Sequence, residues 1–190
     1  MKKTFAVSIA VLFVCVSFAA AKEMPARIFH REQNIKWKEH QLEQQKERVE
    51  TRKSLQGKTP EEKKAAWKPL KEKQQAENKA FRQKMHDENM AFLKTRLAEN
   101  KKMTDTQKNE LIIFFETQFA ENVSFRDRQH SENVSFLAKI AADTSLTQAQ
   151  KKEALRAHLH KQKEERLLHR KQQTGERKSL REKSKSETKK

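Results

Sequence analysis

Glu121-Asn122-Val123-Ser124-Phe125 returns eleven residues later as Glu132-Asn133-Val134-Ser135-Phe136. A similar pair stands upstream, as Glu77-Asn78-Lys79-Ala80-Phe81 and Glu88-Asn89-Met90-Ala91-Phe92. Eleven residues make three α-helical turns at about 3.67 residues per turn, so successive copies fall on nearly the same stripe of a helix. Within each copy, asparagine and phenylalanine are three residues apart and share that stripe. The repeat therefore predicts long helices.

Three threonines mark the expected starts of helices. Each stands three residues before a glutamate or glutamine that can complete a capping box: Thr59 with Glu62, Thr104 with Gln107, and Thr147 with Gln150. These threonines are 45 and 43 residues apart, and the asparagines of the two pentapeptide pairs are 44 residues apart. The mature chain thus reads as four copies of a unit of about 44 residues, with degraded copies at both ends.

The caps and the repeat together predict an all-α protein. We expect four long helices, at residues 25–55, 60–101, 105–142 and 148–172. Short connections favour antiparallel neighbours, so the helices should form extended hairpins or a thin, cradle-like bundle. Residues 22–169 would form this helical repeat domain. Residues 170–190 are strongly basic, and we expect them to be a disordered tail.

The first 21 residues have the pattern of a secretory signal peptide. Lys2 and Lys3 precede a short apolar run, and Ala19-Ala20-Ala21 provides a small-residue cleavage site. The apolar run is shorter than the 20 or so residues that span a membrane. We therefore expect an exported protein, periplasmic or secreted, cleaved after Ala21.

Composition argues against an enzyme with a deep, dry pocket. The chain has one cysteine, Cys15, inside the predicted signal peptide, and only two glycines. Disulfides, thiol nucleophiles and glycine-rich phosphate loops are therefore not expected in the mature protein. Its seven histidines include no His-x-x-x-His pair, so we expect no metal site and no cofactor. We expect no catalytic residues.

The mature chain carries a formal net charge of +15, because Lys2 and Lys3 leave the +17 of the whole chain with the signal. Such a charge can attract acidic polypeptides or an anionic envelope surface. No aromatic–basic motif for nucleic acid is present, and an exported protein rarely meets nucleic acid.

Two apolar patterns suggest helix packing or partner binding. Ile28, Ile35, Leu42 and Val49 are seven residues apart, a spacing suited to packing along a partner helix. Because the chain has little apolar area of its own, we expect a homodimer. The second pattern is the run 111–119, which is apolar around most of its helix and could leave one face exposed to partners.

The candidate partner-binding residues are those of this run and of the pentapeptide stripe: Ile112, Phe114, Phe115, Phe119, Phe81, Phe92, Phe125 and Phe136. Two interpretations of the stripe stay open. Its phenylalanines and asparagines could recognise a client, or they could fill the helix interface and set its register.

The capped starts resemble the LTxxQ motif of the Spy/CpxP family of periplasmic helical proteins. Leu146-Thr147-Gln148-Ala149-Gln150 matches in full, Met103-Thr104-Asp105-Thr106-Gln107 has Met for Leu, and Lys58-Thr59-Pro60-Glu61-Glu62 is a looser copy. The resemblance implies a thin, cradle-shaped antiparallel dimer. It also implies an ATP-independent chaperone for unfolding clients, or a sensor or inhibitor in envelope-stress signalling.

Two functions are the principal hypotheses, and binding of a polyanion by the basic surface is a third. The first is a non-catalytic binding protein that captures unfolded polypeptides, or a regulatory protein partner, on a basic surface containing phenylalanine. The alternative is a structural coiled-coil scaffold or envelope-surface protein that binds no client.

Overall fold

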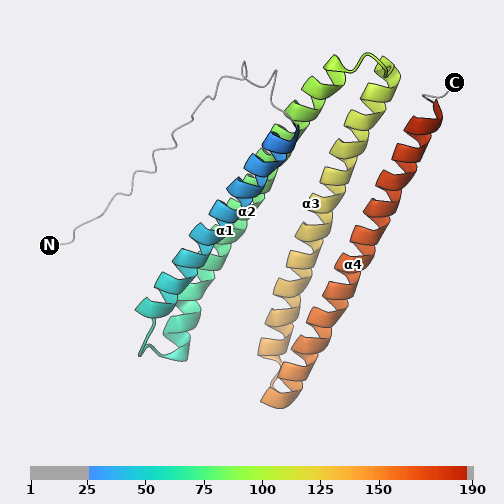
Figure 1. Cartoon of the computed structure of the whole chain (residues 1–190). Coiled ribbons are helices and arrows are strands. Elements are labelled where there is room, and N and C mark those ends of the chain that lie inside the picture. The colour runs from blue at the N-terminus through green and yellow to red at the C-terminus, as the bar shows by residue number, and fades with distance from the viewer. Residues whose placement is uncertain (1–25, 188–190) are drawn as a thin grey trace. The chain divides into compact units, whose positions relative to one another are not determined.

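The protein is all-α, as predicted. The structure, a computed structural model, describes residues 26–187 (Figure 1). The predicted signal peptide at residues 1–21 lies outside these described residues. Four helices follow one another: α1 (Ala26–Ser54), α2 (Pro60–Glu99), α3 (Asp105–Ala142) and α4 (Gln148–Glu187). No strand occurs in the described part of the chain.

Hydrogen bonds at the helix starts account for these boundaries. Thr104 accepts a hydrogen bond from the backbone N–H of Gln107, whose side chain accepts one from the N–H of Thr104, so the capping box before α3 is complete. Thr59 and Glu62 make the same reciprocal pair before α2. Between α1 and α2, Gly57 has a φ of 76°, a left-handed conformation that glycine adopts without strain.

The chain divides into two compact units, with the boundary inside α2 between Met85 and His86. In the first unit, α1 and the first part of α2 lie side by side as an antiparallel hairpin. In the second unit, α3 and α4 form another hairpin (Figure 1). Both hairpins have short connections, at residues 55–59 and 143–147, as the sequence predicts.

The hairpins bury mainly glutamine. Among the described residues, the buried apolar side chains are Leu55, Met85, Met90 and Leu97. The buried polar side chains are all glutamines: Gln33, Gln44, Gln74, Gln118, Gln129, Gln162 and Gln173. Gln33, Gln44 and Leu55 are eleven residues apart, and so are Gln118 and Gln129. The eleven-residue period is therefore the period of the hairpin interfaces.

The prediction of a disordered tail at residues 170–190 is wrong as far as Glu187, where α4 ends. The reason is that the interface with α3 continues along this segment. Gln173 is buried, and the guanidinium of Arg177 donates to the side chain of Gln118. Farther along, Lys183 forms an ion pair with Glu110 at 2.8 Å. Basic composition alone did not reveal these contacts.

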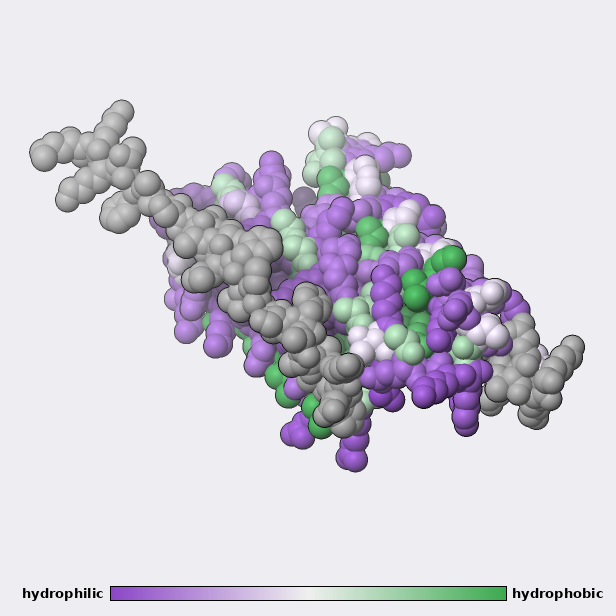
Figure 2. Space-filling model, turned by 90° about the horizontal axis from the view of Figure 1, so that it is seen from above, coloured by the Kyte–Doolittle hydropathy of each residue, from purple (hydrophilic) through white to green (hydrophobic). Residues whose placement is uncertain are grey.

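Hydrophilic side chains cover most of the face shown in Figure 2, and apolar ones are scattered among them. None of the four helices is apolar enough over a sufficient length to cross a membrane, as judged over the described residues.

Candidate functional site

Paired glutamines hold α3 and α4 together at two levels. Gln129 Nε2 donates to the backbone carbonyl of Gln162 at 3.1 Å, and Gln162 Nε2 donates to the carbonyl of Gln129 at the same distance. Gln118 and Gln173 make the same reciprocal pair, with both bonds at 3.3 Å. Each amide thus donates one N–H to a backbone carbonyl of the facing helix, which is why a polar residue can occupy this position.

A histidine, an asparagine and a phenylalanine lie beside each glutamine pair. Asn122 Nδ2 donates to the carbonyl of Gln118 at 2.7 Å and to Gln173 Oε1 at 3.0 Å. This leaves Asn122 Oδ1 facing His169 Nε2 at 3.1 Å, so the imidazole donates from Nε2. The ring of His169 stacks on Phe125, with centroids 4.3 Å apart and planes within 9°. Asparagine thus sets the register and phenylalanine packs across the interface.

The same cluster occurs in both units. In the first unit, His40 stacks on Phe81 and bonds Asn78 at 3.0 Å, beside the reciprocal pair Gln44–Gln74. Asn78 and Phe81 stand 44 residues before Asn122 and Phe125. The third cluster, at the other end of the α3–α4 hairpin, stacks His158 on Phe136, with Asn133 bonded to His158 at 2.9 Å. These contacts support the interpretation that the stripe packs the helices and sets their register.

The histidine, glutamine and arginine on the facing side of each cluster were not predicted, although their common spacing was present in the sequence. The helix facing three of the four Asn-x-x-Phe copies carries the pattern His-x-x-x-Gln-x-x-Glu-Arg, which stands at residues 40–48, 158–166 and 169–177. The final arginine donates to the glutamine of the facing helix: Arg48 to Gln74, Arg166 to Gln129, and Arg177 to Gln118. Spacing alone marks these three segments as equivalent.

A variant of the cluster joins α2 to α3 within the second unit. His86 stacks on Phe119, with centroids 3.7 Å apart, and its Nε2 contacts Glu116 at 2.8 Å. Glutamate here replaces asparagine three residues before the phenylalanine. Met90 is buried four residues after His86, where the other clusters have glutamine.

The predicted phenylalanines share the same degree of burial. The aromatic candidates are all half-buried: Phe81, Phe92, Phe114, Phe115, Phe119, Phe125 and Phe136. Phe114 and Phe115 contact each other edge to face, with centroids 5.5 Å apart. Ile112 is half-buried, and its neighbour Ile113 is the large apolar side chain of this run that is exposed, at 64%.

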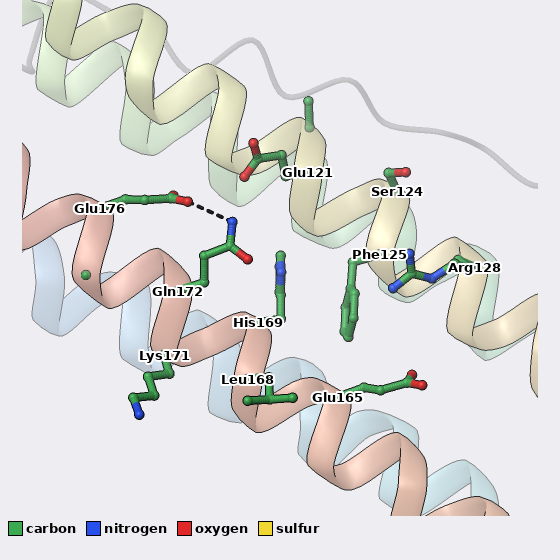
Figure 3. A pocket seen from close by; sticks show the side chains of 12 residues that line it. Glu121, Ser124, Phe125, Arg128, Glu165, Leu168, His169, Lys171, Gln172 and Glu176 are labelled. Atoms are coloured by element: carbon green, nitrogen blue, oxygen red, sulfur yellow. Dashed lines mark hydrogen bonds between the residues drawn. The ribbon is translucent and has the colours of Figure 1, made fainter.

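An open groove lies between α3 and α4 beside the cluster of Phe125 and His169. Its volume is about 1100 Å³. Figure 3 shows the Phe125 and His169 rings facing each other in the groove, with Leu168 next to them. Arg128 lies over the Phe125 ring at 5.3 Å from its centroid. No side chain fills the space beside Gly175, since a Cβ there would meet no atom within 4 Å.

Charged side chains surround this apolar strip. The carboxylates are Glu121, Glu165 and Glu176, and the cations are Arg128 and Lys171. Hydrogen bonds donated by Gln172 and Gln118 lower the pKa of Glu176 below its ordinary value of 4.5. In the first unit, Glu47 occupies the equivalent position, and the ammonium of Lys73 together with the amide of Gln74 lowers its pKa too.

The lowered pKa of Glu176 predicts an acid-sensitive hairpin. A group with a depressed folded pKa stabilises the fold above its unfolded pKa, and the contribution disappears as the pH falls through the folded value. We expect the urea midpoint of the protein to fall as the pH drops below about 4.5, and Glu176→Gln to show a smaller fall. Glu164→Gln, on the exposed side of α4, should follow the wild type. Equal pH dependence in Glu176→Gln and the wild type would contradict this role.

Within residues 26–187, no group of three or more His, Cys, Asp or Glu side chains is arranged to hold a metal ion. The site offers instead an open groove with an apolar strip and charged side chains of both signs, next to the stacked rings of Phe125 and His169. Comparison of the chain with known protein families, curated proteins and solved structures found no match.

Proposed function

We propose that this protein is an exported, non-catalytic helical binding protein that holds unfolded or partly folded polypeptides in the groove between α3 and α4. The observation that carries the proposal is the groove itself, which is open to solvent and lined by the apolar side chains of Phe125 and Leu168. Leu168 is 66% exposed, so it is free to contact a client. Apolar surface rimmed by polar residues is typical of a site for protein partners.

Charge supports the same proposal. The helix α4 carries thirteen Lys and Arg against six Glu, whereas α3 carries four against six Asp and Glu. A basic helix on one side of the groove would speed the encounter with acidic clients, and the apolar floor would then hold them. Unfolded segments expose apolar side chains that fit such a floor without a specific sequence.

Suppression of aggregation tests the proposal. The probe is an acidic test protein that is unfolded by reduction of its disulfides, followed by light scattering. We expect the wild type to delay aggregation at near-equimolar ratio and Leu168→Glu to lose most of this effect, because a carboxylate replaces the exposed apolar floor. Leu167→Glu is the matched control, since Leu167 is 53% exposed on the same helix and does not line the groove.

Two outcomes would contradict this assignment. No suppression by the wild type would remove the chaperone-like function. Suppression that is lost in Phe115→Glu but kept in Leu168→Glu would place binding on the 111–119 run of α3 instead of the groove.

The second candidate function is a structural scaffold that binds no client. The observation in its favour is that Phe81, Phe119, Phe125 and Phe136 each stack on a histidine of the facing helix. Rings stacked in this way pack the interface between helices. A wild type that suppresses no aggregation and resists limited proteolysis along all four helices would favour the scaffold.

A further inference from the structure

The groove between α3 and α4 lies where one copy of the repeated cluster differs from the other two. When the three copies are aligned on the pattern His-x-x-x-Gln-x-x-Glu-Arg, Gly175 stands where the others have Lys46 and Glu164. In the same copy, Leu168 stands where the others have a glutamate and an alanine. The copy that lines the groove therefore lacks one long polar side chain and gains one apolar side chain.

Packing of the hairpin does not require glycine at position 175. A Cβ there would meet no atom within 4 Å, and glycine is less favourable than alanine inside a helix. Across the groove, α3 presents two small, exposed residues, Ala120 and Ser124. A side chain of another molecule can therefore enter this space and lie against the backbone of α4.

Two carboxylates flank the space beside Gly175. Figure 3 shows Glu121 of α3 and Glu176 of α4 at the same end of the groove. Gln118 and Gln172 each donate to one oxygen of Glu176. Each carboxylate oxygen can accept a second hydrogen bond, so Glu176 can still bind an incoming donor.

The cations that line the groove lie away from these two carboxylates. Arg128 is at the other end, where it pairs with Glu132 at 3.7 Å and covers the ring of Phe125. Lys171 points away from the space between the two helices (Figure 3). The end of the groove beside Gly175 is thus locally acidic, although α4 as a whole is basic.

We propose that the groove selects polypeptide segments in which a lysine or arginine stands three residues from a bulky apolar residue. This inference rests on the proposed function and names the kind of segment that the groove holds. The aliphatic stem of the basic side chain lies beside Gly175 and Ala120, and its charged group binds Glu121 and Glu176. The apolar residue contacts Leu168. The net charge of the client governs the encounter, and this local pair of contacts governs what is held.

The spacing of three residues follows from the geometry of α4. Gly175 and Leu168 are seven residues apart, which is about 10 Å along a helix. In the polyproline II conformation, which is common in unfolded chains, three residues make one turn of about 9 Å. Side chains three residues apart in such a segment point to the same side. One unfolded segment can therefore reach both positions at once.

Fluorescence anisotropy with labelled peptides tests this selectivity on the full chain. The peptides are short Gly/Ser sequences with a leucine followed, three residues later, by either lysine or glutamate. We expect the lysine peptide to bind at least about tenfold more tightly, because charge-assisted hydrogen bonds to the carboxylates replace repulsion. The net charge of +17 favours the glutamate peptide, so a preference for lysine reports the local carboxylates. A peptide with serine for leucine should also bind more weakly than the lysine peptide.

Filling the space beside Gly175 separates ligand binding from stability. Gly175→Leu should raise the dissociation constant of the lysine peptide at least about tenfold, because its side chain occupies the space. Its urea midpoint should equal or exceed that of the wild type, since leucine is a better helix former than glycine. Gly175→Ala is the matched control. It should be stabilised in the same way and keep its affinity within about threefold, because a methyl group leaves most of the space open.

A charge change at Glu121 tests the role of the carboxylates. Glu121→Lys should remove the preference for the lysine peptide, because an ammonium then faces the incoming cation. Glu164→Lys makes the same charge change on the exposed side of α4, outside the groove, and should leave the preference as it is in the wild type.

The outcomes separate this inference from the proposed function. Equal binding of the lysine and glutamate peptides, or a Gly175→Leu variant that binds as the wild type does, would overturn the inference. Suppression of aggregation by the wild type would in that case leave the proposed function intact. A wild type that binds no peptide and suppresses no aggregation would overturn both.

Discussion

Replacing Gln129 by leucine should destabilise the α3–α4 hairpin by about 2 kcal/mol. Gln129 is 6% exposed, and its amide donates to the carbonyl of Gln162 at 3.1 Å. Its Oε1 accepts from Arg166 at 3.2 Å. Leucine can make neither bond, and Gln162 would then face an apolar side chain across the interface. The free energy of unfolding from urea titration measures the loss.

The control is the same substitution on an exposed surface. Gln41→Leu changes an exposed glutamine of α1, and we expect a change within about 0.5 kcal/mol. A loss of that small size in Gln129→Leu would mean that the reciprocal bonds add nothing to stability.

Replacing both members of the pair should cost much less than the sum of the two single changes. Two leucines would bury apolar surface against each other, and no half of a polar pair would remain buried. The register should become less specific, because the side chain–backbone bonds that pin the two helices are gone. Hydrogen exchange along α3 and α4 would report this as faster exchange, while the urea midpoint would fall by less than the two single changes together predict. Additive losses in the double variant would contradict the argument.

Ending the chain after His169 should destabilise the second unit by about 3 kcal/mol, because several hydrogen bonds from α4 to α3 disappear together. The truncation removes Gln173 and Arg177, which bond Gln118, and Lys183, which pairs with Glu110. Asn122 also loses its bond to Gln173. We expect faster hydrogen exchange in residues 105–125 and a lower thermal midpoint.

A shorter truncation tests whether stability depends on the contacts of α4 with α3 or on the basic residues as such. Ending the chain after Lys183 removes three lysines, Lys185, Lys189 and Lys190, but keeps Gln173, Arg177 and Lys183, so the thermal midpoint should stay near that of the wild type. If both truncations left hydrogen exchange in α3 unchanged, residues 170–187 would be a tail that adds nothing to the hairpin.

The periodic part of the fold was predictable. Helices are local structures, so the caps at Thr59 and Thr104 and the turn at Gly57 could place the starts and the first connection from spacing alone. The predicted helices at 60–101 and 105–142 differ from α2 and α3 by at most two residues. The 44-residue repeat also has structural meaning, since Asn78 and Asn122 make the same contacts in their two units.

The residues that complete each cluster were not predicted, because their role is defined by a second helix. Gln162 reads as a solvent-exposed residue in a sequence rich in Gln, Glu and Lys, yet its side chain is 1% exposed. Burial of an amide is tolerated only where backbone carbonyls of a facing helix accept its N–H groups. His169 likewise has no visible role until Phe125 and Asn122 lie opposite.

The end of the fourth helix was likewise decided by contacts with a second helix. Residues 170–187 are basic and poor in apolar residues, and composition favours disorder for such a segment. The structure instead continues α4 along α3. Gln173 and Arg177 stand eleven residues after Gln162 and Arg166 and make the same kinds of contact with α3.

The sequence by itself determined where the helices start, their period of eleven and the repeat of about 44 residues, because capping and helical periodicity act between residues close in the chain. Only the tertiary structure decided which residues are buried. Phenylalanine, the most apolar member of the repeat, is half-buried against histidine, and glutamine occupies the centre. The physical reason is that the central side chains of a hairpin lie within reach of the facing backbone, whose carbonyls accept the N–H groups of a buried amide.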